Sequence, residues 1–250
     1  MMARFDPLIV IPVYDHERAI AALLARLLGH GVPVLLVDDG SGAGCAATLG
    51  NLAAATPGRV SLLRLETNQG KGAAVMAGLR EAGRRGHSHV LQIDADGQHD
   101  PDDVPAFLAQ ARATPDAVIN GRPRFDASVP RGRLYGRYAT HVWVWINTLS
   151  FEIVDSMCGF RVYPLAPTLR VIDRARIGRR MDFDTEIIVR LHWAGLRVHN
   201  LDTRVTYPGD GVSHFDLWRD NLRISAMHAR LFFGMLRRLP RLLARKAGRK

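Results

Sequence analysis

The sequence predicts an α/β fold with a mostly parallel sheet flanked by helices, followed by a basic helical extension at the C-terminus. Within the first 120 residues, short apolar runs alternate with segments that have helical apolar spacing. Strict alternation of strand and helix is typical of right-handed βαβ units, which build a parallel sheet. A chain of 250 residues is long enough for one large domain with a substantial core.

The expected elements of this first half follow in order. Asp100 can cap the fourth helix and Pro101 can occupy its first turn. The apolar runs predicted as buried strands are residues 8–13, 34–39, 60–65, 89–94 and 117–120. The segments predicted as helices are residues 17–28, 46–55, 73–85 and 102–113.

Beyond residue 121 the alternation weakens. Residues 122–136 are rich in Arg, Pro and Gly and are predicted to form a loop. Residues 217–245 form a long amphipathic helical pattern, which Pro240 should end or kink. The remaining expected elements are a helix over 138–153, a strand over 160–163, a helix over 183–193 and a strand over 197–207.

The net charge of +10 lies almost entirely in the tail, where residues 217–250 hold eight Arg and two Lys against one Asp. A nucleic-acid-binding fold would more often spread its basic residues through the domain, so no nucleic-acid partner is expected. A basic and apolar tail is typical of a helix on an anionic membrane surface, while a helix packed on its own body is the alternative.

The cysteines, the N-terminus and the longest apolar stretch indicate the cellular compartment. Two cysteines, Cys45 and Cys158, cannot build a disulfide framework, which favours a reducing compartment. The N-terminus lacks the apolar stretch of a signal peptide. The longest apolar stretch, residues 139–151, is too short to span a bilayer. A cytoplasmic protein that is peripheral on the inner face of the membrane is therefore expected.

Polar residues gather where four of the predicted strands end. They lie in residues 12–17 (PVYDHE), 38–41 (DDGS), 68–72 (NQGKG) and 94–99 (DADGQH). Ligands of open parallel sheets bind outside the carboxyl ends of the strands. These four segments should therefore face one crevice.

The alternating carboxylates Asp94 and Asp96 are hard oxygen ligands suited to Mg²⁺ or Mn²⁺. A diphosphate leaving group needs such a cation to neutralise its developing charge. An EF-hand loop starting at Asp94 is excluded, because His99 and Pro105 stand where Gly and Glu are required. A metal-dependent phosphohydrolase remains an alternative, although Gln98 replaces the hydroxyl residue that its motif needs.

Five motifs in order, PVYDHE, VDDGS, NQGKGAAVMAG, QIDADGQHDP and DSMCGFRVY, resemble the signature of family 2 glycosyltransferases, particularly the group similar to dolichol-phosphate mannose synthases. The resemblance covers residues 7–215. It implies a GT-A fold with a Rossmann-like sheet, a nucleotide-diphosphate sugar as donor, a divalent metal and inversion at the anomeric carbon. It also implies a catalytic domain over 1–215, with a nucleotide-sugar half (1–120) and an acceptor half (121–215), before a tail over 216–250.

The resemblance also implies roles for individual residues. Asp155 matches an acid on the acceptor side. Asp184 matches a general base, although an acid favoured by the start of a helix is an equal interpretation; Glu186 is the neighbouring alternative. The donor positions are Pro12, Tyr14, Val37, Asp39, Asp94, Ala95 and Arg122, and the metal positions are Asp94, Asp96 and Gln98.

Two departures from the mannose synthases leave the acceptor open. Pro208 and His214 stand where those enzymes carry an Arg and a Lys that grip phosphate, and Asp184 stands where they usually lack a carboxylate. A phosphate acceptor needs no base, whereas a hydroxyl gains from one. Either polyprenyl phosphate or a lipid hydroxyl is therefore expected. A non-catalytic module that binds nucleotide sugar or membrane is a further alternative.

Overall fold

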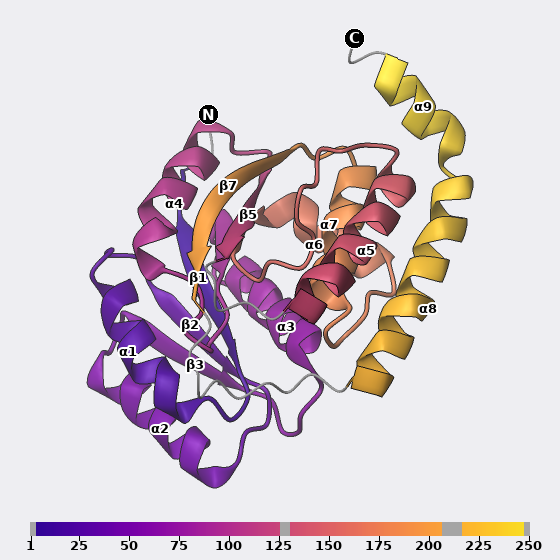
Figure 1. Cartoon of the computed structure of the whole chain (residues 1–250). Coiled ribbons are helices and arrows are strands. Elements are labelled where there is room, and N and C mark those ends of the chain that lie inside the picture. Colours follow the sequence, from indigo (N-terminus) through magenta and orange to yellow (C-terminus); the bar gives the residue numbers. More distant parts are fainter. Residues whose placement is uncertain (1–3, 126–130, 207–216, 248–250) are drawn as a thin grey trace.

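The computed structural model describes residues 4–125, 131–206 and 217–247. Seven strands of this part form one sheet in the order β3-β2-β1-β4-β6-β5-β7 (Figure 1). β6 runs antiparallel to both of its neighbours, and the other pairs are parallel. The strands are β1 (Pro7–Val13), β2 (Val34–Asp38), β3 (Val60–Arg64), β4 (His89–Gln92), β5 (Val118–Phe125), β6 (Arg161–Pro164) and β7 (Val198–Val205).

Helices cover both faces of the sheet, which is why its central strands read as continuous apolar runs. Along β1, Leu8 and Val10 face one cluster of buried side chains, while Ile9, Ile11 and Val13 face another. The first cluster includes side chains of α3, α6, α7 and α8, and the second those of α1, α2 and α4. The helices are α1 (Glu17–Leu28), α2 (Ala43–Ala55), α3 (Lys71–Arg84), α4 (Val104–Ala113), α5 (Arg131–Thr148), α6 (Leu165–Arg174), α7 (Phe183–Trp193), α8 (Leu217–Leu236) and α9 (Leu239–Ala247), with a 3₁₀ turn at Pro101–Asp103.

The first half confirms the predicted mostly parallel α/β fold, and α1 and α7 have the predicted bounds. Asp100 caps the 3₁₀ turn before α4, since its side chain accepts a hydrogen bond from the backbone N–H of Asp102. Pro101 follows at the first position, where its missing N–H costs nothing.

The predicted loop over 122–136 is wrong at both ends. β5 continues to Phe125 because it pairs with β7 over its whole length, from Val118 opposite Val198 to Phe125 opposite Val205. α5 begins at Arg131 and ends at Thr148, before Leu149 takes a positive φ of 52°. A helix that the sequence did not predict, α6, follows β6 directly.

The predicted break at Pro240 falls earlier. α8 ends at Leu236 and α9 starts at Leu239, so that Pro240 lies in the first turn of α9. That position suits proline, because a helix has no partner for its first N–H groups.

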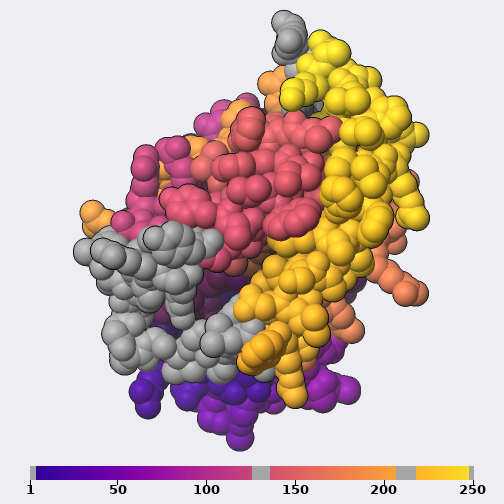
Figure 2. Space-filling view, turned by 45° about the vertical axis from the view of Figure 1, so that its right-hand side comes forward, coloured from indigo at the N-terminus to yellow at the C-terminus, as the bar shows by residue number. Residues whose placement is uncertain are grey.

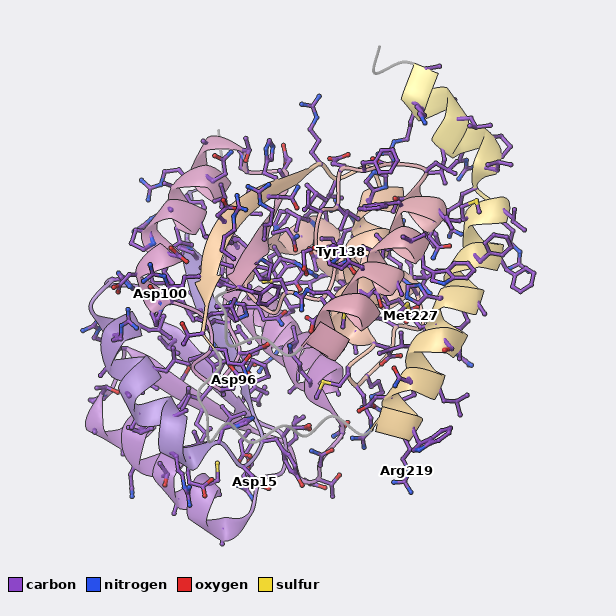
Figure 3. All side chains as sticks on the ribbon, in the orientation of Figure 1. Asp15, Asp96, Asp100, Tyr138, Arg219 and Met227 are labelled. Carbon is purple, nitrogen blue, oxygen red and sulfur yellow. The ribbon has the colours of Figure 1, made fainter. Side chains whose placement is uncertain are left out.

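α8 lies along α5 and shares the core of the body (Figure 1). Met227 and Leu231 are fully buried in the same cluster as the side chains of α3 and α7. Figure 3 shows Met227 on the side of α8 that faces α5. The boundary at residue 215 and the division at residue 120 remain predictions.

Candidate active site

Two of the polar segments predicted to meet, residues 68–72 and 94–99, do so at the carboxyl ends of the central strands, and the start of α7 joins them. The ammonium of Lys71, at the start of α3, lies 2.7 Å from a carboxylate oxygen of Asp94 after β4. It lies equally close, at 2.7 Å, to a carboxylate oxygen of Asp184 in the first turn of α7. A predicted metal ligand and the predicted base are thus joined by one cation.

The charges of this cluster depend on each other. Burial disfavours the charge on Lys71, but the Asp184 and Asp94 carboxylates more than offset this and raise its pKa above the ordinary value. Burial likewise opposes the charge on Asp94, yet the Lys71 ammonium, followed by His99, lowers the pKa of Asp94. Lys71 therefore remains protonated and Asp94 ionised at neutral pH.

A buried network orients Asp184 from behind. The amide of Gln92 donates to the second carboxylate oxygen of Asp184 at 3.0 Å, and the hydroxyl of Tyr163 donates to Gln92 at 2.9 Å. Arg161, whose side chain is fully buried on β6, donates at 2.9 Å to the backbone carbonyl of Asp184. These contacts fix the rotamer of Asp184 and the start of α7.

Asp94 and Asp96 sit where a cation could be held. Asp94 Oδ1 is buried and has no hydrogen-bond partner in the described part of the chain. Gly159 lets the backbone pack directly against this carboxylate, since a Cβ at that position would clash with it. Asp96 closes a tight turn by accepting from the backbone N–H of Gln98 at 3.0 Å. Figure 3 labels Asp96, which lies in the loop that follows β4.

Burial, and then the nearby Asp94 charge, raises the pKa of Asp96 to about 6. Within the described residues, His, Cys, Asp and Glu do not gather in groups of three or more that could hold a metal ion. Two carboxylates are nevertheless a donor set that Mg²⁺ commonly uses when substrate phosphates supply further oxygens.

The predicted nucleoside side lies beside this cluster, at the end of β2. The buried Asp39 carboxylate accepts hydrogen bonds from the backbone N–H groups of Gln69 and Gly70, both at 2.8 Å. Burial raises the pKa of Asp39, although these two N–H groups oppose the shift. Asp39 therefore shapes the loop that leads into Lys71, and each of its oxygens retains a lone pair.

The other predicted donor positions differ in what they expose. Pro12 is buried at the end of β1, and Tyr14, which follows it, is half-buried. Val37 and Ala95 are buried in the two hydrophobic clusters, so that only their backbone could meet a ligand. The guanidinium of Arg122 pairs with Asp202 on β7, which Arg124 also contacts at 2.9 Å.

The two other acids predicted as catalytic have structural partners. Asp155 is held by Arg137 at 2.7 Å and by His141 at 3.3 Å, both on α5. Burial works against its ionisation, but His141 and Arg137 hold the pKa of Asp155 well below its usual range.

Glu186, fully buried on α7, accepts from the backbone N–H of Gly178 at 2.8 Å, from Arg190 at 2.6 Å and from Arg230 of α8 at 3.0 Å. Successive residues of an α-helix turn by about 100°, so Glu186 points about 200° away from Asp184. The structure thus brings Asp94 and Asp184 together, whereas Asp155 and Glu186 hold α5 and α8.

Sequence reasoning did not foresee the roles of Lys71 and Arg161. For Arg161 a signal was present, because an arginine within an apolar strand must find partners when it is buried. Pro208 and His214, which bear on the acceptor, lie outside the described residues.

A profile of glycosyl transferase family 2 matches residues 8–175. The match covers most of the sheet and all of the strand ends described above, and the chain belongs to this family of sugar-transferring enzymes. The match agrees with the resemblance that the five motifs carry.

Curated relatives place the chain near the mannose synthase group. It is 36% identical over 172 residues to a polyprenol monophosphomannose synthase of Mycolicibacterium smegmatis, covering 62% of this chain and 60% of that protein. It is 32% identical over 202 residues to an undecaprenyl-phosphate mannosyltransferase of Micrococcus luteus, covering 76% of this chain and 79% of that protein.

Solved structures show the same GT-A fold. TarS of S. aureus, in complex with UDP-GlcNAc, has a TM-score of 0.64 at 15% identity, covering 90% of this chain and 66% of that one. Glucosyl-3-phosphoglycerate synthase of Mycobacterium tuberculosis, in complex with Mn²⁺ and UDP-glucose, has a TM-score of 0.62 at 15% identity. The likeness covers 93% of this chain and 78% of that one. The GT-A prediction is thereby confirmed.

In the described ranges, none of the helices is both long and apolar enough to cross a membrane.

Proposed function

We propose that this chain is an inverting, metal-dependent glycosyltransferase that moves a sugar from a nucleotide-diphosphate sugar to polyprenyl phosphate at a membrane surface. The observation that carries the proposal is the Asp94–Lys71–Asp184 cluster at the ends of the strands, beside the loop that Asp39 holds. The named relatives that act on polyprenol or undecaprenyl phosphate support the acceptor class.

On this proposal the donor lies across the strand ends. Asp39, with Pro12 and Tyr14, would hold the nucleoside, since a carboxylate can accept hydrogen bonds from a base or ribose. Val37 and Ala95 would contribute backbone atoms. Arg122 would have to exchange Asp202 for a donor phosphate, an exchange suited to its planar fork of donors.

The residues present fit a divalent cation. Asp94 Oδ1 is a buried oxygen with an open lone pair, and Asp96 lies two residues further along the same turn. Asp94 and Asp96 would hold Mg²⁺ or Mn²⁺, with Gln98 as a further ligand. When bound, the cation would offset the charge that develops on the diphosphate leaving group. The structural neighbour that contains Mn²⁺ and UDP-glucose supports this part of the proposal.

The Asp184 environment favours a phosphate acceptor over a hydroxyl. A general base must be directed at the acceptor, whereas here Lys71 and Gln92 hold the two oxygens of Asp184 in place. A phosphate oxygen is already an anion and can attack the anomeric carbon directly as the bond to the diphosphate breaks. Asp184 then serves to position Lys71, whose ammonium group could offset the negative charge on the departing diphosphate.

Asp155 and Glu186 are proposed as positioning residues. Asp155 fixes α5 through Arg137 and His141, and Glu186 fixes α8 through Arg230.

The surface supports action at a membrane. In the described part of the chain, the exposed large apolar side chains all belong to α5, the segment after it, α8 and α9. Figure 2 shows these helices side by side on one face. This group consists of Tyr138, Val142, Trp143, Ile146, Phe151, Val154, Trp218, Leu222, Phe233, Leu236 and Leu243.

The tail divides its apolar residues between this face and the body. Leu231, Met235 and Leu242 are buried, whereas Phe233 is 62% exposed and Leu243 is 52% exposed. Exposed apolar and basic side chains on one helical surface suit the headgroup region of an anionic leaflet. Because Cys45 and Cys158 are free and buried, a reducing cytoplasmic location on the inner face is proposed.

A transfer assay tests the proposed function. Purified full-length protein is incubated with undecaprenyl phosphate, MnCl₂ and a panel of UDP- and GDP-sugars, and glycolipid is separated by chromatography. We expect product with at least one donor, no product in EDTA, and none from Asp96→Ala, whose fold is checked by circular dichroism. Sugar release at the same rate without the lipid would contradict the proposal and favour a hydrolase.

A further inference from the structure

We propose that the cavity between α8 and the segment joining α6 to α7 is a second anion site, which binds a phosphate group other than the diphosphate of the donor. This cavity has a volume of about 480 Å³, within the range of small-molecule sites. The inference does not depend on the proposed donor, acceptor or membrane location.

The walls of the cavity are rich in arginine. Arg176, Arg179 and Arg180 come from the joining segment, and Arg223 and Arg230 come from α8. The lining also holds one carboxylate, Asp182. Guanidinium groups carry rigid forks of donors that match phosphate oxygens, and they stay charged at any physiological pH.

Two of these arginines, Arg223 and Arg230, already pair with carboxylates. Arg230 lies 3.0 Å from Glu186 and 3.9 Å from Asp182, and Arg223 lies 2.8 Å from Asp220. Glu186 is shared with Arg190, so its charge is divided between two guanidiniums. The carboxylates around the cavity are therefore fewer than the arginines.

The joining segment supplies the excess charge. The guanidinium of Arg180 donates to the neutral side-chain oxygen of Asn68 at 3.1 Å, and that of Arg179 donates to the neutral Gln69. Neutral partners satisfy donors but do not cancel the charge, although Arg180 also interacts electrostatically with the Asp39 carboxylate. An anion in the cavity would lower the mutual repulsion of these arginines.

The cavity is separate from the reaction centre. Asp184 faces Lys71 on one side of α7, whereas Glu186 on the other side pairs with Arg230 of the cavity wall. The two sites are still connected, because the backbone carbonyl of Arg179 accepts from the N–H of Ala73 at 2.9 Å, two residues after Lys71. A phosphate held by Arg179 and Arg180 would thus brace the loop that carries Gln69 and Lys71.

A titration of full-length protein with sodium pyrophosphate tests the site. EDTA is included so that no metal-dependent diphosphate binding contributes, and ionic strength is held constant with NaCl. The double variant Arg176→Gln/Arg179→Gln removes two charges of the cavity wall that form no ion pair with the described carboxylates. We expect calorimetry to show at least tenfold weaker binding than for wild type.

The matched control is Arg170→Gln/Arg174→Gln, which removes the same charge from exposed positions of α6 outside the cavity. It should bind pyrophosphate within twofold of wild type. The single variants Arg176→Gln and Arg179→Gln, each expected to weaken binding at least threefold, serve if the double variant does not fold. Equal affinity of wild type and cavity variants, or an equal loss in the control, overturns the proposal.

A vesicle-binding assay distinguishes a lipid headgroup from a soluble phosphate compound as the source of the phosphate. If a lipid headgroup is the source, binding to phosphatidic acid vesicles should fall at least tenfold in the cavity variant, and pyrophosphate should compete. If a soluble phosphate compound is the source, vesicle binding is unchanged while the pyrophosphate effect remains. UDP binding in MnCl₂ should be within twofold of wild type in either case, which separates this site from the donor site.

Discussion

Lys71 and Asp184 form a largely buried ion pair, with 2.7 Å between the ammonium nitrogen and a carboxylate oxygen, although they lie far apart in the sequence. Asp94 completes the cluster from a third segment at the same distance from Lys71, 2.7 Å. One cation therefore holds together the starts of α3 and α7 and the end of β4. Four predictions test this cluster and the surfaces around it.

The first prediction concerns Lys71→Met, which keeps much of the side-chain volume and removes the charge. Two neighbouring carboxylates would lose their cation, and breaking a buried pair in this way costs about 3 kcal/mol or more. For a chain of this size the melting temperature should fall by about 10 °C. Mn²⁺ should stabilise the variant more than wild type, because a divalent cation can replace the lost charge. Lys246→Met on the exposed part of α9 is the control, and equal melting temperatures for both variants would exclude the cluster as a structural element.

The second prediction concerns Asp184→Asn, which retains the shape of the side chain. If the acceptor is a phosphate, turnover should fall less than about tenfold, whereas loss of a general base typically costs ~10² to 10⁴. Initial rates at saturating donor and lipid measure the difference. A fall of a thousandfold with unchanged UDP affinity would establish a hydroxyl acceptor instead.

The third prediction concerns the exposed apolar residues of the tail. Phe233→Ser and Leu243→Ser remove side chains that are 62% and 52% exposed. Burying such a side chain contributes about 1.5–3 kcal/mol, so each change should weaken binding to anionic vesicles at least tenfold. Melting temperature should stay within about 2 °C of wild type, because neither residue belongs to the core. Vesicle flotation at low salt measures the effect, and unchanged flotation of both variants would remove α8 and α9 from the membrane-facing surface.

The fourth prediction concerns stability in acid and His228, a buried residue of α8. Its ring stacks on that of Trp143 of α5, with 6.1 Å between the ring centroids. Burial lowers the pKa of His228 from 6.5 to about 4. The unfolded chain therefore takes up a proton as pH falls below about 6.5, while the folded chain does so only near pH 4.

Between these values the free energy of unfolding should decrease by up to about 1.4 kcal/mol per pH unit from this residue. His228→Phe should remove the part of this decrease in the free energy of unfolding that protonation of His228 causes. Urea denaturation at pH 8, 6 and 5 measures it as a difference between wild type and variant that grows toward low pH. A difference that is constant with pH would show that His228 does not contribute.

The sequence by itself determined the family, the order of the first four strands and helices, and the segments that gather at the strand ends. It could do so because these depend on local patterns: apolar runs, helical spacing, and the rule that parallel strands end at one edge of a sheet. Asp39, Asp94 and Asp96 lie where this rule placed their segments.

Only the tertiary structure decided which side chains face one another. Asp184 and Glu186 stand two residues apart, and no local pattern tells which of them turns toward Lys71, because that depends on how α7 packs against α3 and α8. The antiparallel direction of β6 and the burial of Arg161 could likewise not be predicted from the local sequence. Both arise from contacts between segments distant in the chain, since the energy of a buried charge depends on partners that the sequence around it does not contain.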